Sequence, residues 1–262
     1  MTDKAKVTET KEVKETVPDI NQVDVELPSL GKFYDGRLPE GKVTIRPIKV
    51  SEEKLLAGGG SRMKLVDKVL ERCMLTKTLP LRDMLISDKF WLMLNLRSIS
   101  YGGDYMFMLK CNNCSMEFRH SITLPTGLQL KRATDSDKEP FDVKLPIANK
   151  TVSLRFLRGV DEEEIERYLK QLPRNATDEG DPAYVYRLSR FIVKVDGKEL
   201  DPLEKMNFCD GLIGQDSLAI RRAIAENETG PILTIRTQCP GCKADVETSL
   251  PLTNEFFPAS VA

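Results

Sequence analysis

Hydrophobic side chains recur along the chain with two different periods, which separate strand-like from helix-like stretches. Residues 43–50 (VTIRPIKV) alternate between apolar and polar side chains, and this alternation predicts a strand. Residues 63–76 place apolar side chains three and four positions apart, which predicts a helix with one apolar face. That face consists of Val66, Val69, Leu70 and Cys73. The other elements predicted in this half are 51–57 with Ser51 as N-cap, 87–99 with Ser87 as N-cap, and two strands at 105–110 and 116–124.

The second half repeats this order of elements. Alternating residues predict a hairpin over 143–157, and a strand–CxxC–strand segment covers 231–252. Four helices are predicted between them: 160–172 with Asp161 as N-cap, 183–193, 201–213 with Asp201 as N-cap before Pro202, and 215–227. Helices and antiparallel hairpins mixed along the chain predict an α+β fold.

A constant offset relates the two cysteine pairs and the helices before them. Cys111 and Cys239 are 128 positions apart, and so are Asp88 and Asp216. Upstream, residues 43–56 match residues 152–165 at an offset of 109. We interpret this order as two related half-domains, 23–127 and 138–253, each ending in a hairpin that carries CxxC. Chance similarity of helix patterns is the alternative, since such patterns align easily.

Composition bears on the two ends of the chain. Residues 1–22 are almost all Lys, Glu, Thr, Asp and Val, and they offer too little apolar area to offset the entropy of ordering. They predict a disordered N-terminal tail. Residues 254–262 predict a C-terminal tail.

Charge and hydropathy narrow the class of protein. The formal net charge of −1 over 262 residues argues against a nucleic-acid binder, which usually carries a basic surplus. No apolar run reaches the roughly 18–20 residues that a membrane span needs. The charged first residues do not resemble a secretory signal, so the cysteines are expected to stay reduced.

Two CxxC motifs predict a zinc site. In a turn between strands, this spacing directs both sulfur atoms the same way, and structural zinc takes four such ligands in a tetrahedron. If the half-domains pack together, one Zn²⁺ per chain is shared by Cys111, Cys114, Cys239 and Cys242. The metal would then clamp the two halves, and its binding energy would contribute to folding.

Other uses of the cysteines stay open. A thioredoxin-like pair needs its first thiol at a helix N-terminus, whereas both pairs here lie between strands. The four thiols could also be buried without metal, or His120 could replace one of them as a ligand. Cys73 and Cys209 lie on helical faces and are interpreted as core residues. With a single histidine in the chain, catalysis of the Ser-His-Asp or Cys-His type has little support.

Three stretches resemble a known family: LPSLGKFYDG (27–36), VTIRPIKVSEEKLLA (43–57) and LRSISYGGDYMFMLKCNNC (96–114). They are similar to T4-type baseplate proteins, the hub or hub-assembly proteins of contractile-tailed bacteriophages, most clearly over 26–127. The resemblance implies no catalytic residues. The zinc prediction comes from the cysteine spacing and not from the family.

The resemblance implies a non-enzymatic structural or assembly component of the phage tail baseplate hub. It implies other hub or tail-tip proteins as partners, and a location in the virion after assembly in the host cytoplasm. Two alternatives of different classes remain: a zinc-ribbon adaptor that binds nucleic acid, and a thiol oxidoreductase.

Overall fold

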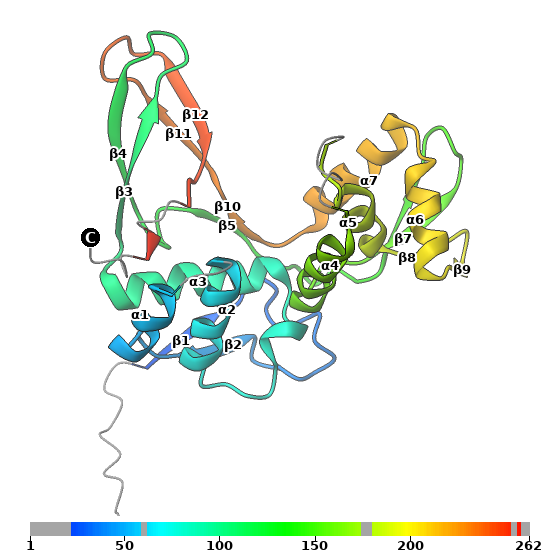
Figure 1. The fold of residues 1–262 in the computed structure, drawn as a ribbon, viewed down its shortest axis with the longest axis horizontal. Coiled ribbons are helices and arrows are strands. Elements are labelled where there is room, and N and C mark those ends of the chain that lie inside the picture. The colour runs from blue at the N-terminus through cyan, green and yellow to red at the C-terminus, as the bar shows by residue number, and fades with distance from the viewer. Residues whose placement is uncertain (1–21, 59–61, 174–179, 253–255, 258–262) are drawn as a thin grey trace, which may run out of the picture.

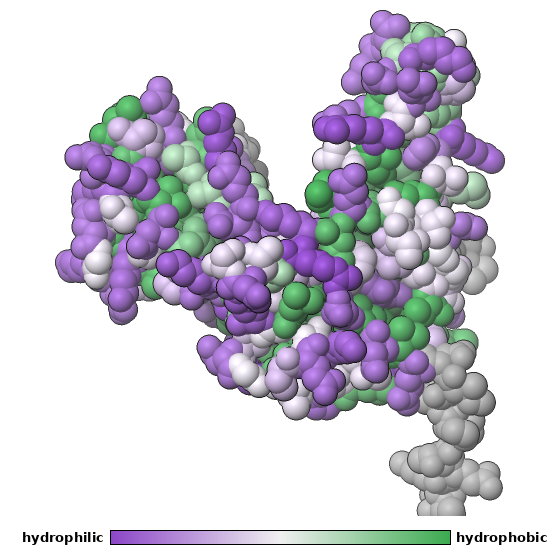
Figure 2. All heavy atoms as spheres, turned by 180° about the vertical axis from the view of Figure 1, so that it is seen from behind, coloured by the Kyte–Doolittle hydropathy of each residue, from purple (hydrophilic) through white to green (hydrophobic). Residues whose placement is uncertain are grey.

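The computed structural model describes residues 22–58, 62–173, 180–252 and 256–257. Figure 1 shows three parts, which we call the body (residues 23–101), the finger (two hairpins within 104–123 and 234–249) and the arm (141–227). The finger and the arm both rise from the body, and Figure 2 shows a V-shaped hollow between them. The predicted tail 1–22 lies outside the described residues except for Gln22. Of the predicted tail 254–262, Phe256 and Phe257 are described, and both are buried.

The body is built around one largely buried helix. Strand β1 (Val23–Glu26) pairs antiparallel with β2 (Lys42–Ile45). Helices α1 (Val50–Leu56) and α2 (Arg62–Cys73), the short 3₁₀ turn η1 (Leu81–Asp83) and α3 (Ile86–Tyr101) follow. In α3 the side chains of Leu92, Leu94 and Leu96 are fully covered, and the charged residues Asp88, Lys89 and Arg97 are buried as well. The apolar face predicted for α2 is confirmed: Val66, Val69, Leu70 and Cys73 are buried.

The arm contains a four-stranded antiparallel sheet and four helices. The strand order is β6 (Phe141–Lys144), β7 (Thr151–Leu154), β8 (Ile192–Val195) and β9 (Lys198–Glu199). The helices are α4 (Gly159–Gln171), α5 (Tyr184–Phe191), α6 (Pro202–Asp210) and α7 (Gly214–Asn227). The prediction that a helix continues to 193 is wrong. β-Branched residues and a two-residue turn at Asp196 and Gly197, both with positive φ, favour the β8–β9 hairpin instead.

The finger consists of two antiparallel hairpins, as predicted. Strand β3 (Asp104–Lys110) pairs with β4 (Glu117–Thr123), and β11 (Thr234–Gln238) pairs with β12 (Asp245–Ser249). At its root, β5 (Gln129–Lys131) pairs with β10 (Gly230–Ile232), and neither of these strands was predicted as a separate element. Alternate residues of the hairpins are buried: Tyr105, Phe107, Leu109, Phe118, Ile235 and Val246. The fold is therefore α+β, as the sequence predicts.

Three of the four predicted helix caps are wrong, and in α1 and α4 an acid at the third helical position takes the capping role instead, whereas the N–H of Leu85 before α3 donates to the Tyr34 hydroxyl. Ser51 and Ser87 lie inside their helices, which begin after Lys49 and Leu85. Asp161 lies at the third helical position of α4, where its carboxylate accepts the N–H of Arg158 at 2.9 Å. An acid at this position satisfies a free N–H as well as a capping hydroxyl does. The prediction of Asp201 as the N-cap of α6 is confirmed.

The same polar contacts occur in the body and in the arm. Asp88 of α3 accepts the N–H of Ser29 at 3.0 Å, and Asp216 of α7 accepts the N–H of Ile147 at 2.8 Å. Arg46 forms an ion pair with Glu52 six positions later, and Arg155 forms one with Asp161, also six positions later. Each carboxylate is buried, and each contact ties a helix to a neighbouring strand or turn.

The arm packs on the body through close backbone contacts. The N–H of Gly159 donates to the carbonyl of Met84, and the N–H of Ile86 donates to that of Leu157, both at 3.0 Å. A Cβ atom at Gly159 would lie 2.8 Å from the carbonyl oxygen of Leu81, so a side chain does not fit there. This contact fixes where α4 begins relative to the body.

We expect Asp88→Ala to lower the free energy of unfolding by about 2–5 kcal/mol, because the buried Ser29 N–H and Tyr34 hydroxyl would lose their acceptor. Urea unfolding measures the change. As a control, Asp83→Ala removes a half-exposed ion pair with Arg37 and should cost less than about 1 kcal/mol. Equal unfolding midpoints for the two variants would contradict this role of Asp88.

Candidate metal centre

Each CxxC motif lies in a tight turn at the tip of its hairpin. Cys111 follows the last residue of β3, and Cys239 follows the last residue of β11. Both first cysteines donate their N–H to the carbonyl five positions later, at 2.9 Å in each case. The fourth residue after each is in the left-handed region, with φ of 59° and 61°. The acceptor carbonyls belong to Met116 and Ala244, and the residues with positive φ are Ser115 and Lys243.

The four predicted cysteines come together at the tip of the finger. The Sγ atoms of Cys111 and Cys242 are 3.6 Å apart, and those of Cys114 and Cys239 are 3.7 Å apart. All four sulfur atoms lie within 4.8 Å of one another. A disulfide would need about 2.05 Å. A tetrahedron with Zn–S bonds of about 2.3 Å has S–S edges of about 3.8 Å, so these residues fit a tetrathiolate metal site.

The two CxxC turns also pack against each other. Cys111 and Cys239 are buried, whereas Cys114 and Cys242 are exposed. A Cβ atom at Gly241 would lie 2.7 Å from Sδ of Met116, which comes from the other hairpin. Because Gly241 has no side chain, the side chain of Met116 can lie over the second CxxC turn. Four protein ligands and this cover are typical of a closed, structural site rather than a catalytic one.

Hydrogen-bond donors around the sulfur atoms spread their pKa values apart. The side-chain amide of Asn113, 3.5 Å from Cys242 Sγ, together with the N–H of Ala244, lowers the pKa of Cys242 to about 6. The pKa of Cys239 is also lowered, first by the N–H of Cys242. The N–H of Met116 lowers the pKa of Cys114, but hydrogen bonds to the other sulfur atoms, Cys242 first, raise it to about 12.

These pKa shifts indicate that the four thiols need a nearby cation in order to ionise fully. Some thiols share protons with neighbouring thiolates, because four negative charges at this distance repel one another. A bound dication removes that repulsion, and metal binding would therefore release protons.

The other candidate residues lie elsewhere. His120 is on β4, where its ring makes an edge contact with Phe107 at 5.6 Å between centroids. Among the described residues, the ligand cluster at the tip contains the four cysteines and no histidine. Cys73 and Cys209 are buried, and burial raises their pKa values to about 11 and about 12. Their interpretation as core residues is confirmed.

The model of one protein family, described as T4 bacteriophage base plate protein, matches residues 18–258. The chain belongs to this family. The resemblance noted in the sequence is thereby confirmed over most of the chain. No curated protein and no solved structure matches this chain.

Membership in this family indicates which assembly the chain is part of. A base plate protein is part of the phage tail baseplate, and it interacts with other baseplate proteins. In the described ranges, no helix combines the length and the apolar character that crossing a membrane requires.

Two residues beside the four cysteines of this base plate protein were not expected from the sequence. Asn113 lies between Cys111 and Cys114, and its side-chain amide reaches Cys242 on the other hairpin. Met116 was placed in a strand, yet its sulfur packs on Gly241. Both contacts join segments more than 120 positions apart, so no local sequence pattern in either hairpin predicts them.

In the metal-free protein, Cys242 should react with iodoacetamide well before Cys114 at pH 7, because a pKa of about 6 leaves it largely ionised. Peptide mass mapping after brief alkylation measures the order. Asn113→Ala removes the strongest donor and should slow the labelling of Cys242. Faster labelling of Cys114 than of Cys242 would contradict this order of the two pKa values.

Proposed function

We propose that this chain is a non-enzymatic structural or assembly component of the baseplate hub, held in shape by one Zn²⁺ at Cys111, Cys114, Cys239 and Cys242. The observation that carries the proposal is the meeting of two sulfur pairs from distant parts of the chain, with cross-hairpin Sγ–Sγ distances of 3.6 and 3.7 Å. The ion would supply two positive charges and four bonds to sulfur.

The clamp acts on two half-domains in this proposal. One half, 23–127, contributes the β3–β4 hairpin, and the other, 138–253, contributes β11–β12. The recurring contacts of Asp88 and Asp216 with the turns after β1 and β6 support a common origin, since the two acids share the 128-residue offset of the cysteines. The arm's β8 and β9 would then be an addition to the second half.

A baseplate part must keep its shape under load, and the finger needs help to do so. An isolated two-stranded hairpin is at best marginally stable in water. A metal at the tip and the β5–β10 pair at the root would hold both ends of the finger. Its outer faces could then be presented in a fixed position to other hub or tail-tip proteins, during assembly in the host cytoplasm and in the virion.

The alternative functions have weaker support. A thiol oxidoreductase would favour a reactive cysteine at a helix N-terminus, and here both pairs follow strands. A nucleic-acid adaptor would favour a basic finger, and the outer face of β12 carries Asp245 and Glu247. We therefore keep the structural role as the conclusion.

Protein purified without chelators should contain one zinc per chain, bound by four sulfur atoms. Elemental analysis gives the stoichiometry, and cobalt substitution should give the absorption of a tetrahedral thiolate site. Protein that is folded and free of zinc under these conditions would remove the clamp from the proposal.

Cys239→Ser should lower the free energy of unfolding by about 3 kcal/mol or more in zinc-loaded protein, because one metal ligand is lost. The same substitution should cost much less after zinc has been removed. The difference between the two conditions isolates the ligand role from simple packing. An equal cost with and without metal would show that Cys239 is only a core residue.

A phage lacking this gene should fail to complete tails, and the supplied wild-type protein should restore them. Electron microscopy of the particles and mass spectrometry of virions and of assembly intermediates distinguish a retained part from an assembly factor. Normal tails without the protein would overturn the structural role.

A further inference from the structure

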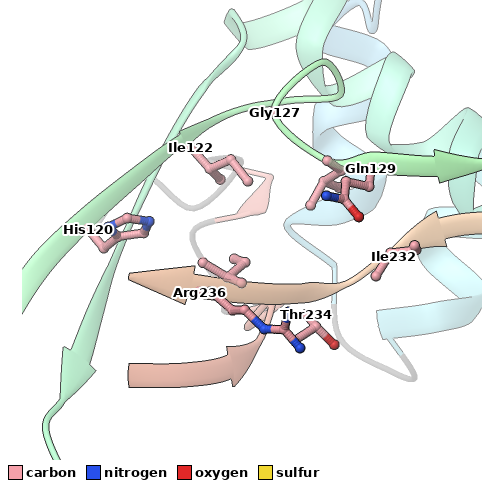
Figure 3. Close-up of a pocket in the computed structure, with 9 residues that line it drawn as sticks. His120, Ile122, Gly127, Gln129, Ile232, Thr234 and Arg236 are labelled. Carbon is pink, nitrogen blue, oxygen red and sulfur yellow. The ribbon is translucent and has the colours of Figure 1, made fainter. Parts of the chain in front are cut away.

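A slot of about 550 Å³ opens at the root of the finger, between β4 and β11. Figure 3 shows His120 and Ile122 of β4 facing this space from one side and Gln129 from above. The opposite wall is formed by β11, through Thr234, Ile235 and Arg236. Hydrophobic residues gather on the side of the finger that borders the hollow toward the arm (Figure 2).

One wall of the slot is an unpaired strand edge. In the described part of the chain, β11 pairs with β12 and with no other strand. The N–H of Leu250 donates to the carbonyl of Leu233, and that of Cys239 donates to Ala244, so odd-numbered residues of β11 turn their backbone groups toward β12. Hydrogen bonding alternates along an antiparallel strand. Thr234 and Arg236 therefore turn their N–H and C=O groups away from β12, at the slot.

On the other side of the finger, between β12 and β3, residues of the chain itself contact the strand edge. After β12, the chain crosses to β3, where the Tyr105 hydroxyl donates to the carbonyl of Pro251 at 2.6 Å. Phe256 then packs on Tyr105 with ring centroids 5.3 Å apart. Pro251 and Phe256 thus both contact Tyr105 of β3. No described segment does the same between β4 and β11.

The lining sets the chemistry of an occupant. Ile122, Leu128, Ile232 and Ile235 make the walls largely apolar, and Ile232 is 43% exposed. Arg236 and His120 also line the slot, but Arg236 donates from Nε to Glu247 of β12 at 2.8 Å, so its charge is already paired. A complementary segment therefore carries apolar side chains on the face that enters the slot.

We propose that this slot receives an extended segment of another baseplate protein with apolar side chains on one face, which adds to the β11 edge as a further strand. Its backbone pairs with Thr234 and Arg236, and its apolar side chains enter between Ile122 and Ile235. Strand addition of this kind draws affinity from main-chain hydrogen bonds and specificity from alternate side chains. The partner's class rests on the proposed function, whereas the mode of binding rests on the slot.

Thr234→Pro tests the edge, because proline removes an N–H that points away from β12 and blocks a pairing strand. Ser249→Pro is the matched control. Ser249 is the cross-strand partner of Thr234, and its N–H points to the opposite side of the same hairpin. In complementation of the gene-deleted phage, Thr234→Pro should lower incorporation into baseplates or assembly intermediates about fivefold or more, and Ser249→Pro should not.

A second pair of variants leaves the backbone intact. Ile122→Trp fills the slot and should also lower incorporation, whereas Met108→Trp changes an exposed residue on the outer face of the same hairpin and should not. Zinc content and thermal melting of each variant confirm that the finger is folded. Normal incorporation of folded Thr234→Pro and Ile122→Trp proteins overturns the inference.

A photo-cross-linker at Ile232 identifies the occupant in assembled particles, with one at Met108 as control. Cross-links from position 232 to an extended apolar segment of another baseplate protein support the inference. Cross-links to a second copy of this chain, to nucleic acid, or from position 108 alone overturn it. If the wild-type protein enters neither particles nor intermediates, the proposed function fails as well. Wild-type incorporation with unaffected slot variants overturns the inference alone.

Discussion

The meeting of four sulfur atoms at the finger tip is the constraint on which the architecture depends. Cys114 and Cys239 are 125 positions apart, and fixing the ends of a loop of that length costs about 5 kcal/mol in chain entropy. A structural zinc ion contributes on the order of 10 kcal/mol, enough to exceed this cost. Body–arm packing also shares the task, since Gly159 and Leu157 already bind α4 to the body. A metal bound there would then have only to fix the tips of the two hairpins.

Buried carboxylates organise what lies below the finger, and their surroundings differ. Asp88 is held by the Ser29 N–H and by two hydroxyl groups, and burial raises its pKa. Burial alone would also raise the pKa of Asp161, but hydrogen bonds from Arg155 and Arg158 lower it below its usual range. Acidification through the range of the folded-state pKa therefore removes stability that Asp161 supplies, whereas protonation of Asp88 relieves the cost of a buried charge.

The sequence predicted those parts of the fold whose cause is local. The CxxC spacing sets the turn geometry by itself, and the apolar side chains of α2 repeat with the helical period, so both were found. The starts of α1 and α4 were not, because Glu52 and Asp161 take over the capping role from inside the helix. The strands β5 and β10 are three residues each and pair with one another about a hundred positions apart. Such short, distant pairs leave no periodicity to detect. The grouping of the four cysteines could be proposed only through the repeat, whereas the reach of Asn113 to Cys242 needed coordinates.

If both proposals hold, strand addition at the root would depend on metal binding at the tip. A partner segment gains affinity from the β11 edge only if that edge is already ordered, because any ordering at the moment of binding is subtracted from the affinity. The β10–β5 pair holds one end of β11, and Cys239, directly after its last residue, holds the other. The slot thus lies along a strand that is fixed at both ends. Zinc bound far from the partner would in this way set how strongly the partner binds, without touching it.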